Sequence, residues 1–180
     1  LNMLDALITS KTRLKILLKF FINPSTKGYL RELAAQMNES TNAVRVELDR
    51  LVEAGYLERN ANGNKVYYNA NTGHPLFKDI HNVVKKYLGI DVLIDSVLAK
   101  LGKIHEAYIV GDYAKGVDSG IIDVVIVGTV DYSYLAQLIE KAEGIIKRKI
   151  RPLVLSPKEK TKYKEKLNLD KALLVWHNGK

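Results

Sequence analysis

Cysteine is absent from the 180 residues of the chain, which excludes a disulfide framework and any metal site built on thiolates. The four histidines, His74, His81, His105 and His177, show no spacing typical of a pair of metal ligands. No apolar run approaches the roughly 20 residues that a membrane-spanning helix needs, and no signal peptide is visible at the start. We therefore expect a cytoplasmic protein with no membrane partner, no metal and no other cofactor.

Acidic residues are the minority among the charged ones. The chain has 28 Lys or Arg residues against 20 Asp or Glu, a formal net charge of +8, which favours a polyanionic partner without identifying it. Because the excess is modest, affinity for such a partner must come from the local placement of side chains. Hydrophobic residues at 47% and charged residues at 27% describe an ordinary globular protein, and the length allows one large domain or two small ones.

Two short helices and a hairpin follow one another in the first half of the chain. Apolar residues recur at helical spacing over residues 30–37, and a second amphipathic helix is expected over residues 41–54, with Ser40 as its N-cap. Residues 56–59 and 65–68 are then expected to be two strands joined by a turn. This order of elements is typical of a helix-turn-helix followed by a wing.

The second helix has one apolar and one polar side when its residues are placed at 100° intervals. The side expected to pack holds Val44, Leu48, Leu51 and Val52. The other side begins with Thr41, Asn42 and Arg45, in the turns where a recognition helix meets base edges and phosphates. The alternative is that this side is an ordinary solvated helix face.

These segments resemble the winged helix-turn-helix domain of ArsR-like and MarR-like bacterial and archaeal regulators. The likeness rests on Leu-Arg-Glu-Leu-Ala at 30–34, Ser-Thr-Asn-Ala-Val-Arg at 40–45 and Leu-Val-Glu-Ala-Gly-Tyr-Leu-Glu at 51–58. It implies that the second helix enters the major groove and that the wing touches the neighbouring DNA backbone. The expected DNA-binding residues are Ser40, Thr41, Asn42, Arg45 and Arg50 on the helix, and Arg59, Asn62, Asn64 and Lys65 on the wing.

A long first helix is expected over residues 4–21, ended by Asn23-Pro24. Its apolar surface is wide, which suggests a dimer contact. Arg13 and Lys15 on this helix are candidates for further phosphate contacts or are ordinary solvated charges.

The chain is expected to divide into three parts: a winged helix-turn-helix domain at residues 1–72, a connector helix at 73–89 and a second domain at 90–180. The strands expected in the second domain cover residues 107–110, 121–127 and 150–155, and the helices cover residues 92–101, 134–146 and 158–167. Residues 171–176 are expected to form a final strand or an extended tail. Such alternation indicates a small α/β domain with a mixed sheet, so the whole chain is expected to be α+β.

The second domain contains the sequence IVGDYAKG at 109–116 and DSGIIDVVIV at 118–127. Together they resemble the motif of minimal nucleotidyltransferases in the DNA polymerase β superfamily. In that family a strand ends in Gly-Ser, a Tyr-Ala-basic-Gly turn follows, and the next strand carries Asp-x-Asp. The matching positions here are Gly111, residues 113–116 and Asp123, which implies a nucleotidyltransferase-like fold.

The set of metal-binding acids that nucleotidyl transfer needs is incomplete in this sequence. The family holds two Mg²⁺ ions on paired carboxylates, but here only Asp123 is retained, Val125 stands at the second acid position, and residues 149–155 offer no third acid. We therefore expect no catalysis and a role in folding, dimerisation or ligand binding. The candidate ligand-binding residues are Gly111, Asp112, Lys115, Gly116 and Asp123.

These features predict a sequence-specific transcription regulator that binds double-stranded DNA as a homodimer on an inverted repeat. A small-molecule or nucleotide effector is left open. Two alternatives belong to other classes: a Mg²⁺-dependent nucleotidyltransferase acting on a protein or small molecule, and an antitoxin-like module that binds a partner. The basic segment 147–166 either extends the DNA contact or is a solvated helix face.

Overall fold

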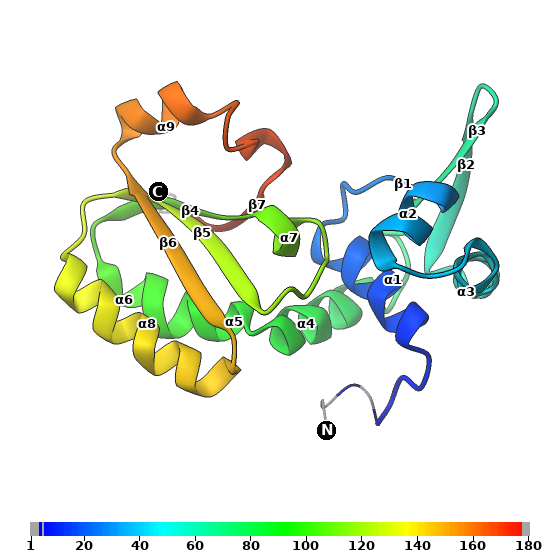
Figure 1. Ribbon diagram of the computed structural model, residues 1–180, viewed down its shortest axis with the longest axis horizontal. Coiled ribbons are helices and arrows are strands. Elements are labelled where there is room, and N and C mark those ends of the chain that lie inside the picture. The colour runs from blue at the N-terminus through cyan, green and yellow to red at the C-terminus, as the bar shows by residue number, and fades with distance from the viewer. Residues whose placement is uncertain (1–3, 5, 178–180) are drawn as a thin grey trace. The chain divides into compact units, whose positions relative to one another are not determined.

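The computed structural model describes residue 4 and residues 6–177 of the chain (Figure 1). The chain divides into two compact units, residues 1–87 and residues 88–180. The first unit combines helices with a small antiparallel sheet, and the second builds helices on a mixed four-stranded sheet. The protein is α+β, as the sequence predicted.

Helices make up most of the first unit. They are α1 (Lys11–Ile22), α2 (Leu30–Met37), α3 (Thr41–Glu53) and α4 (Phe77–Leu88). The strands are β1 (Gly28–Tyr29), β2 (Leu57–Asn62) and β3 (Lys65–Ala70), paired antiparallel in the order β1-β3-β2. β2 and β3 form a hairpin in which Asn62 lies opposite Lys65. Gly63, with a φ of 58°, supplies the left-handed conformation that this two-residue turn requires.

Short polar residues set the ends of these helices. The Oγ atom of Ser10 accepts a hydrogen bond from the backbone N–H of Arg13 and caps α1. Asn38 ends α2 in the left-handed conformation. The Oγ atom of Ser40 accepts a hydrogen bond from the backbone N–H of Ala43 at 3.1 Å. The N-cap predicted at Ser40 is therefore confirmed.

The first helix is shorter than predicted. Helix was expected over residues 4–21, but α1 begins only at Lys11. Its start is fixed by the side chain of Ser10, which caps the first turn. Before the helix, the backbone N–H of Leu7 donates to the carbonyl of Leu4 in a separate turn. Residue 5 of the predicted helix lies outside the described residues.

Apolar side chains from α1, α2 and α3 form the core of the first unit. The fully buried ones are Ile16, Phe20, Phe21, Ile22, Leu33, Val44 and Leu48. Gly28 is needed beside this core, since a Cβ atom there would lie 2.8 Å from the ring of Phe20. Burial of each large apolar side chain stabilises the fold by about 1.5–3 kcal/mol. The predicted packing side of α3 therefore anchors the helix, and the opposite side is left to solvent.

α4 packs against α1 within the first unit. The rings of Phe77 and Phe21 lie 5.5 Å apart between centroids. Nδ1 of His81 donates a hydrogen bond to the carbonyl oxygen of Phe21 at 2.5 Å. The region expected to be a connector, residues 73–89, thus contains a helix with its own contacts to the first unit.

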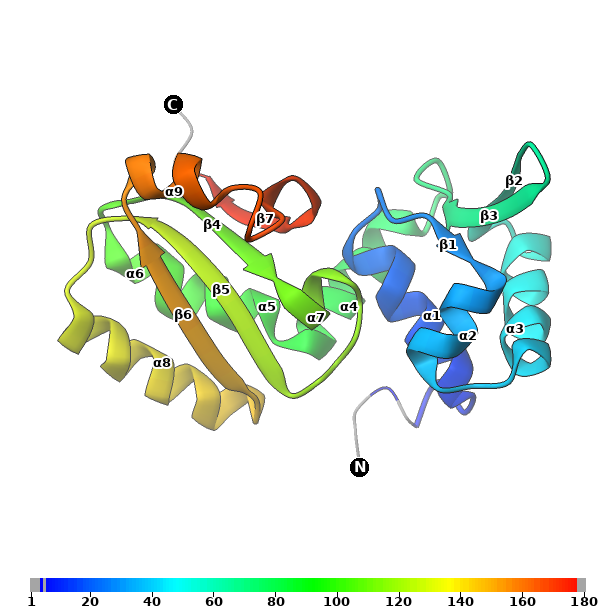
Figure 2. The same cartoon turned by 45° about the horizontal axis from the view of Figure 1, so that its top comes forward.

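The second unit is built on a sheet of order β6-β5-β4-β7 (Figure 2). Its strands are β4 (Ile104–Val110), β5 (Ile121–Gly128), β6 (Lys149–Leu155) and β7 (Leu173–His177). Its helical segments are α5 (Ile90–Leu93), the π-helical turn η1 (Ile94–Leu98), α6 (Ala99–Leu101), α7 (Gly111–Ala114), α8 (Tyr132–Ile146), α9 (Pro157–Tyr163) and the 3-10 turn η2 (Leu169–Lys171). β5 and β6 are parallel, whereas β4 is antiparallel to both of its neighbours. The predicted mixed sheet is confirmed.

Both faces of this sheet are covered. Figures 1 and 2 show α5, α6 and α8 on one face and α9 on the other. On the α9 face, Val125, Val127, Leu155 and Leu169 form a buried cluster. Residues 124–127 of β5 are all buried, which explains the unbroken apolar run of this strand, because a strand covered on both faces has no polar side.

The basic helix near the end of the chain is also shorter than predicted. Helix was expected over residues 158–167, but α9 ends at Tyr163. Its start is fixed by a capping box, in which Ser156 and Glu159 exchange hydrogen bonds between side chain and backbone. Among the residues that the structure describes, no helix has the length and apolar character needed to cross a bilayer.

Candidate functional site

The exposed side of α3 begins with the polar residues predicted to meet DNA. Thr41, Asn42 and Arg45 are all exposed, and they lie in the first turns after the capped Ser40. Arg45 forms no ion pair with the described residues. The helix start also carries unpaired backbone N–H groups and the positive end of the helix dipole. This arrangement leaves a guanidinium, an amide and a hydroxyl free to contact an anion or the edge of a base.

The later turns of α3 are less suited to a polyanion. Asp49 and Glu53 are exposed and fall on the same side as Arg45 by helical spacing. Nη1 of Arg50 lies 3.7 Å from a carboxylate oxygen of Glu47, which partly neutralises that arginine. The cationic part of α3 is therefore its first half.

Glu47 is a buried acid on α3 that fixes the helix to α1. Its Oε2 atom accepts a hydrogen bond from Nε of Arg13 at 2.8 Å, and its Oε1 atom accepts one from Oγ of Ser10, also at 2.8 Å. The side chain is 9% exposed. Because Ser10 also caps α1, the start of α1 and the middle of α3 are held by one polar cluster.

The hydrogen bonds to Glu47 outweigh the cost of its burial. Burial alone would raise the pKa of this carboxyl, but the hydrogen bonds from Arg13 and Ser10, with the charge of Arg13, lower its pKa below the ordinary value. Glu47 is therefore ionised at neutral pH, and its charge is matched by Arg13 inside the unit.

The two cations proposed as extra phosphate contacts on the first helix have partners within the unit. Arg13 is bound to Glu47. Nζ of Lys15 donates to the carbonyl oxygen of Met37 at 2.8 Å and to Oε1 of Glu39 at 2.7 Å. Both side chains thus connect α1 to the residues around α2 and α3.

The hairpin carries the remaining predicted DNA-binding residues. Arg59, Asn62, Asn64 and Lys65 are exposed, and neither Arg59 nor Lys65 forms an ion pair with the described residues. Asn62 and Lys65 lie opposite each other beside the turn. The tip of the hairpin is therefore polar and cationic.

In the second unit, the end of β4 approaches β5 closely at Gly111. This residue has a φ of 66°, and a Cβ atom there would lie 2.9 Å from Oδ2 of Asp123. A side chain at position 111 would therefore strain the backbone and collide with the carboxylate. The sequence singled out both Gly111 and Asp123, and the structure places them next to each other.

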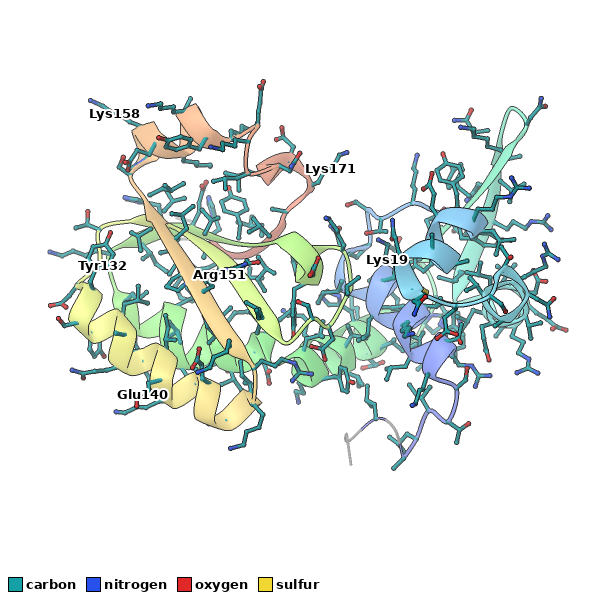
Figure 3. The ribbon with its side chains drawn as sticks, in the orientation of Figure 1. Lys19, Tyr132, Glu140, Arg151, Lys158 and Lys171 are labelled. Atoms are coloured by element: carbon teal, nitrogen blue, oxygen red, sulfur yellow. The ribbon has the colours of Figure 1, made fainter. Side chains whose placement is uncertain are left out.

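Asp123 is bound by an arginine of the neighbouring strand. Asp123 and Arg151 occupy the same register position on parallel β5 and β6. Nε of Arg151 lies 2.5 Å from Oδ1 of Asp123, and Nη2 lies 3.0 Å from Oδ2. These hydrogen bonds and the carboxylate charge raise the pKa of Arg151. Figure 3 shows Arg151 on the sheet, and the second acid position, Val125, is buried in the apolar cluster.

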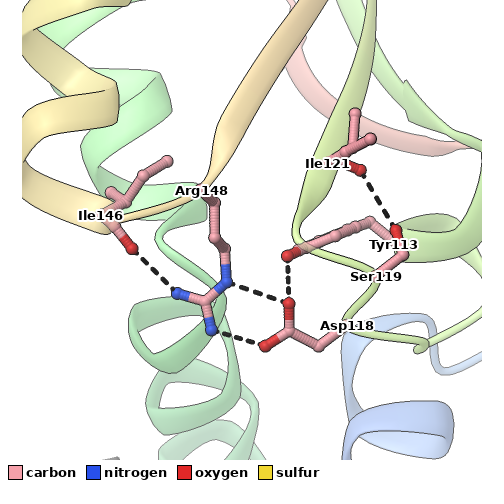
Figure 4. A network of polar contacts seen from close by, with 6 residues as sticks. All are labelled: Tyr113, Asp118, Ser119, Ile121, Ile146 and Arg148. Carbon is pink, nitrogen blue, oxygen red and sulfur yellow. Dashed lines mark hydrogen bonds and ion pairs between the residues drawn. The ribbon is translucent and has the colours of Figure 1, made fainter.

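A second polar network fixes the loop between α7 and β5 (Figure 4). Nε and Nη2 of Arg148 donate to the two carboxylate oxygens of Asp118 at 3.0 and 2.6 Å. The hydroxyl of Tyr113 donates to the same carboxylate, and Nη1 of Arg148 donates to the carbonyl of Ile146 at 3.2 Å. Arg148, which the sequence grouped with a basic segment, instead connects this loop to the start of β6.

The pKa values in this network follow from burial and pairing. Burial would raise the pKa of Asp118, but the hydrogen bonds from Arg148 and Tyr113 lower it below the ordinary value. The pKa of Tyr113 is raised by burial and by its hydrogen bond to Asp118. The network therefore contains an ionised carboxylate, a guanidinium and a neutral phenol.

Of the predicted ligand-binding residues, two line a cavity of about 340 Å³ in the second unit, Gly111 and Lys115. The other lining residues are Val110, Ala114, Leu167, Asn168, Lys171 and Ala172. Asp112, Gly116 and Asp123 are not among them. The sequence missed the contribution of residues 167–172, because only the fold brings this segment beside α7.

Comparisons with known proteins give no family for the chain. No family model and no curated protein matches it. Among solved structures, reduced HlyU from Vibrio cholerae N16961 superposes with a TM-score of 0.36 at 18% identity, over 43% of this chain and 77% of that chain. Human N-acetylserotonin methyltransferase, in complex with SAM, superposes with a TM-score of 0.30 at 14% identity, over 53% of this chain and 32% of that one. Likenesses this distant carry no conclusion about function.

Glu47→Ala is expected to lower the free energy of unfolding by about 2–3 kcal/mol, because it leaves Arg13 and Ser10 without their buried acceptor. Urea unfolding at pH 7 measures the change. Glu53→Ala is the matched control on the same helix and should change the stability by less than about 0.5 kcal/mol. Because the pKa of Glu47 is lowered on folding, its contribution is present above the ordinary carboxyl pKa and is lost as pH falls through the folded pKa. Equal losses in the two variants, or a loss that persists at acid pH, would contradict this role.

Asp118→Asn is expected to destabilise the second unit by about 1–3 kcal/mol, since it removes the charge that faces Arg148 in a partly buried network. Thermal and urea unfolding followed through a signal from the second unit measure the effect. Asp112→Asn changes an exposed carboxylate in the neighbouring turn and should have little effect. If both variants unfold together with the wild type, the network does not hold the loop.

Proposed function

We propose that the protein is a sequence-specific DNA-binding transcription regulator whose first unit is a winged helix-turn-helix. In this proposal α2 and α3 form the helix-turn-helix, α3 enters the major groove, and the β2–β3 hairpin is the wing that reaches the neighbouring backbone. The observation that carries the proposal is the two-sided character of α3. Its apolar side and Glu47 are buried, whereas Thr41, Asn42 and Arg45 are exposed at a capped helix start.

The exposed residues fit separate roles on a duplex. Arg45 suits the O6 and N7 atoms of guanine or a phosphate, and Asn42 suits adenine or a phosphate. Ser40 and Thr41 lie at the helix start, where backbone N–H groups bind phosphate. Arg50 on α3, with Arg59, Asn62 and Lys65 on the wing, would contact the backbone and set the register without reading bases.

The regulator is proposed to act as a homodimer. Two copies related by a two-fold axis place two recognition helices in successive major grooves, about 34–36 Å apart. The preferred site is then an inverted repeat with half-sites about one turn apart.

The second unit is proposed to be a nucleotidyltransferase-like domain without catalysis that serves dimerisation or ligand binding. Two observations support the absence of catalysis. Asp123, the retained acid position, is bound by Arg151, and the second acid position is Val125, whose side chain is buried and cannot ligate a metal. The positive charge beside Asp123 is thus supplied by the protein itself.

Arg45→Ala is expected to weaken binding to the preferred duplex by about 1–3 kcal/mol, or roughly 5- to 150-fold, and to relax the preference at one base position. The duplex is obtained by selection from a random pool, and affinities are measured by fluorescence anisotropy at two or more salt concentrations. Lys78→Ala, at an exposed position of α4, is the control and should leave the base preference unchanged. No enrichment of any sequence by the wild type, or unchanged preference in Arg45→Ala, would count against the proposal.

Incubation of the protein with Mg²⁺ and labelled nucleoside triphosphates, alone and with cell extract as acceptor, is expected to give no covalent labelling beyond that of the extract alone. The physical reason is that one carboxylate held by an arginine cannot position two metal ions. Mass spectrometry and autoradiography measure incorporation. If the wild type gives labelling that disappears in Asp123→Ala, the protein is a nucleotidyltransferase, and the proposed role of the second unit is overturned.

A further inference from the structure

One cavity of the second unit combines apolar walls with uncompensated positive charge. It lies between α7 and residues 167–172 and has a volume of about 340 Å³, within the range of small-molecule sites. Its apolar walls are Val110, Ala114, Leu167 and Ala172, and its polar residues are Lys115, Asn168 and Lys171. No acidic side chain lines it.

Five other cations of this unit have acidic partners among the described residues. The ion pairs are Arg148 with Asp118, Lys149 with Glu143, Arg151 with Asp123, Lys160 with Glu106 and Lys164 with Asp170. Lys115 and Lys171 form no ion pair with the described residues. Two lysines without an ion pair therefore line one cavity whose lining holds no acidic side chain. This composition suits an anion from solution.

The carboxylate of Asp123 does not cancel the positive charge of this cavity. Asp123 lies beside Gly111 at the end of β4, but Arg151 binds both of its carboxylate oxygens. The carboxylate is thus neutralised on its own strand pair and does not line the cavity. An anion in the cavity needs no metal ion to shield it from Asp123.

We propose that this cavity binds a small organic phosphate directly through Lys115 and Lys171, without a metal ion. A phosphate monoester carries a charge of about −1.5 to −2 at neutral pH, which two lysines match, whereas a monocarboxylate would leave one lysine unpaired. Each ammonium group offers three donors to the phosphate oxygens, and the apolar walls accommodate the organic part. The site belongs to the second unit alone, so it stands whether or not the first unit binds DNA.

Isothermal titration calorimetry of the full chain with phenyl phosphate tests the site, because this probe carries a dianion and an apolar ring. Inorganic phosphate tests the contribution of the apolar walls, and benzoate tests whether a carboxylate suffices. Phenyl phosphate is expected to bind more tightly than either, with the same affinity in the presence of EDTA or of Mg²⁺. Lys115→Gln and Lys171→Gln should each weaken it by about tenfold or more, as expected for loss of a hydrogen bond to a charged group.

Lys158→Gln is the matched control, since Lys158 is an exposed lysine of α9 that does not line the cavity (Figure 3). All three lysines are exposed, so the variants should keep the circular dichroism spectrum and unfolding midpoint of the wild type. The proposal is overturned if phenyl phosphate does not bind at millimolar concentration, or if its affinity requires Mg²⁺. It is also overturned if benzoate binds equally well, or if Lys158→Gln weakens binding as much as the two cavity variants.

Discussion

The contact between Glu47 and the pair formed by Ser10 and Arg13 fixes the orientation of α3 against α1. Apolar burial of Val44 and Leu48 holds the helix against the core, and the buried carboxylate of Glu47 adds directed polar contacts to this packing. A shift of the helix that breaks these two hydrogen bonds would leave charges unpaired inside the unit. Glu47 and the apolar residues hold one side of α3 against the unit. The opposite side, with the proposed DNA-binding residues at its start, therefore faces solvent.

The sequence predicted the parts of this site that follow local rules. The cap at Ser40 and the buried positions Val44 and Leu48 come from residue type and helical spacing, and both are confirmed. Glu47 was missed because its partners lie 34 and 37 residues earlier in the chain. Spacing places a residue on a helix face, but it does not show what that face meets.

In the second unit, too, contacts between distant parts of the chain could not be predicted from the sequence. The sequence showed that Val125 cannot ligate a metal, but not that Arg151 lies beside Asp123, since that follows from the parallel register of β5 and β6. Likewise, Lys171 lines the same cavity as Lys115 only through the path of the chain after α9. Arg151 supplies positive charge beside Asp123, whereas Lys115 and Lys171 line a cavity that does not include Asp123. The proposed anion site is therefore distinct from Asp123, the acid position of the nucleotidyltransferase-like motif.

The central claim is that the first half of α3 and the tip of the hairpin form the DNA-binding surface. It is tested most directly by NMR, through titration of ¹⁵N-labelled protein with a duplex selected from a random pool. The account predicts that the largest amide shifts fall on residues 40–45 and 59–65, with smaller changes in the second unit. Shifts centred on residues 158–171, with α3 unchanged, would contradict it and assign the basic surface of the second unit as the site of contact.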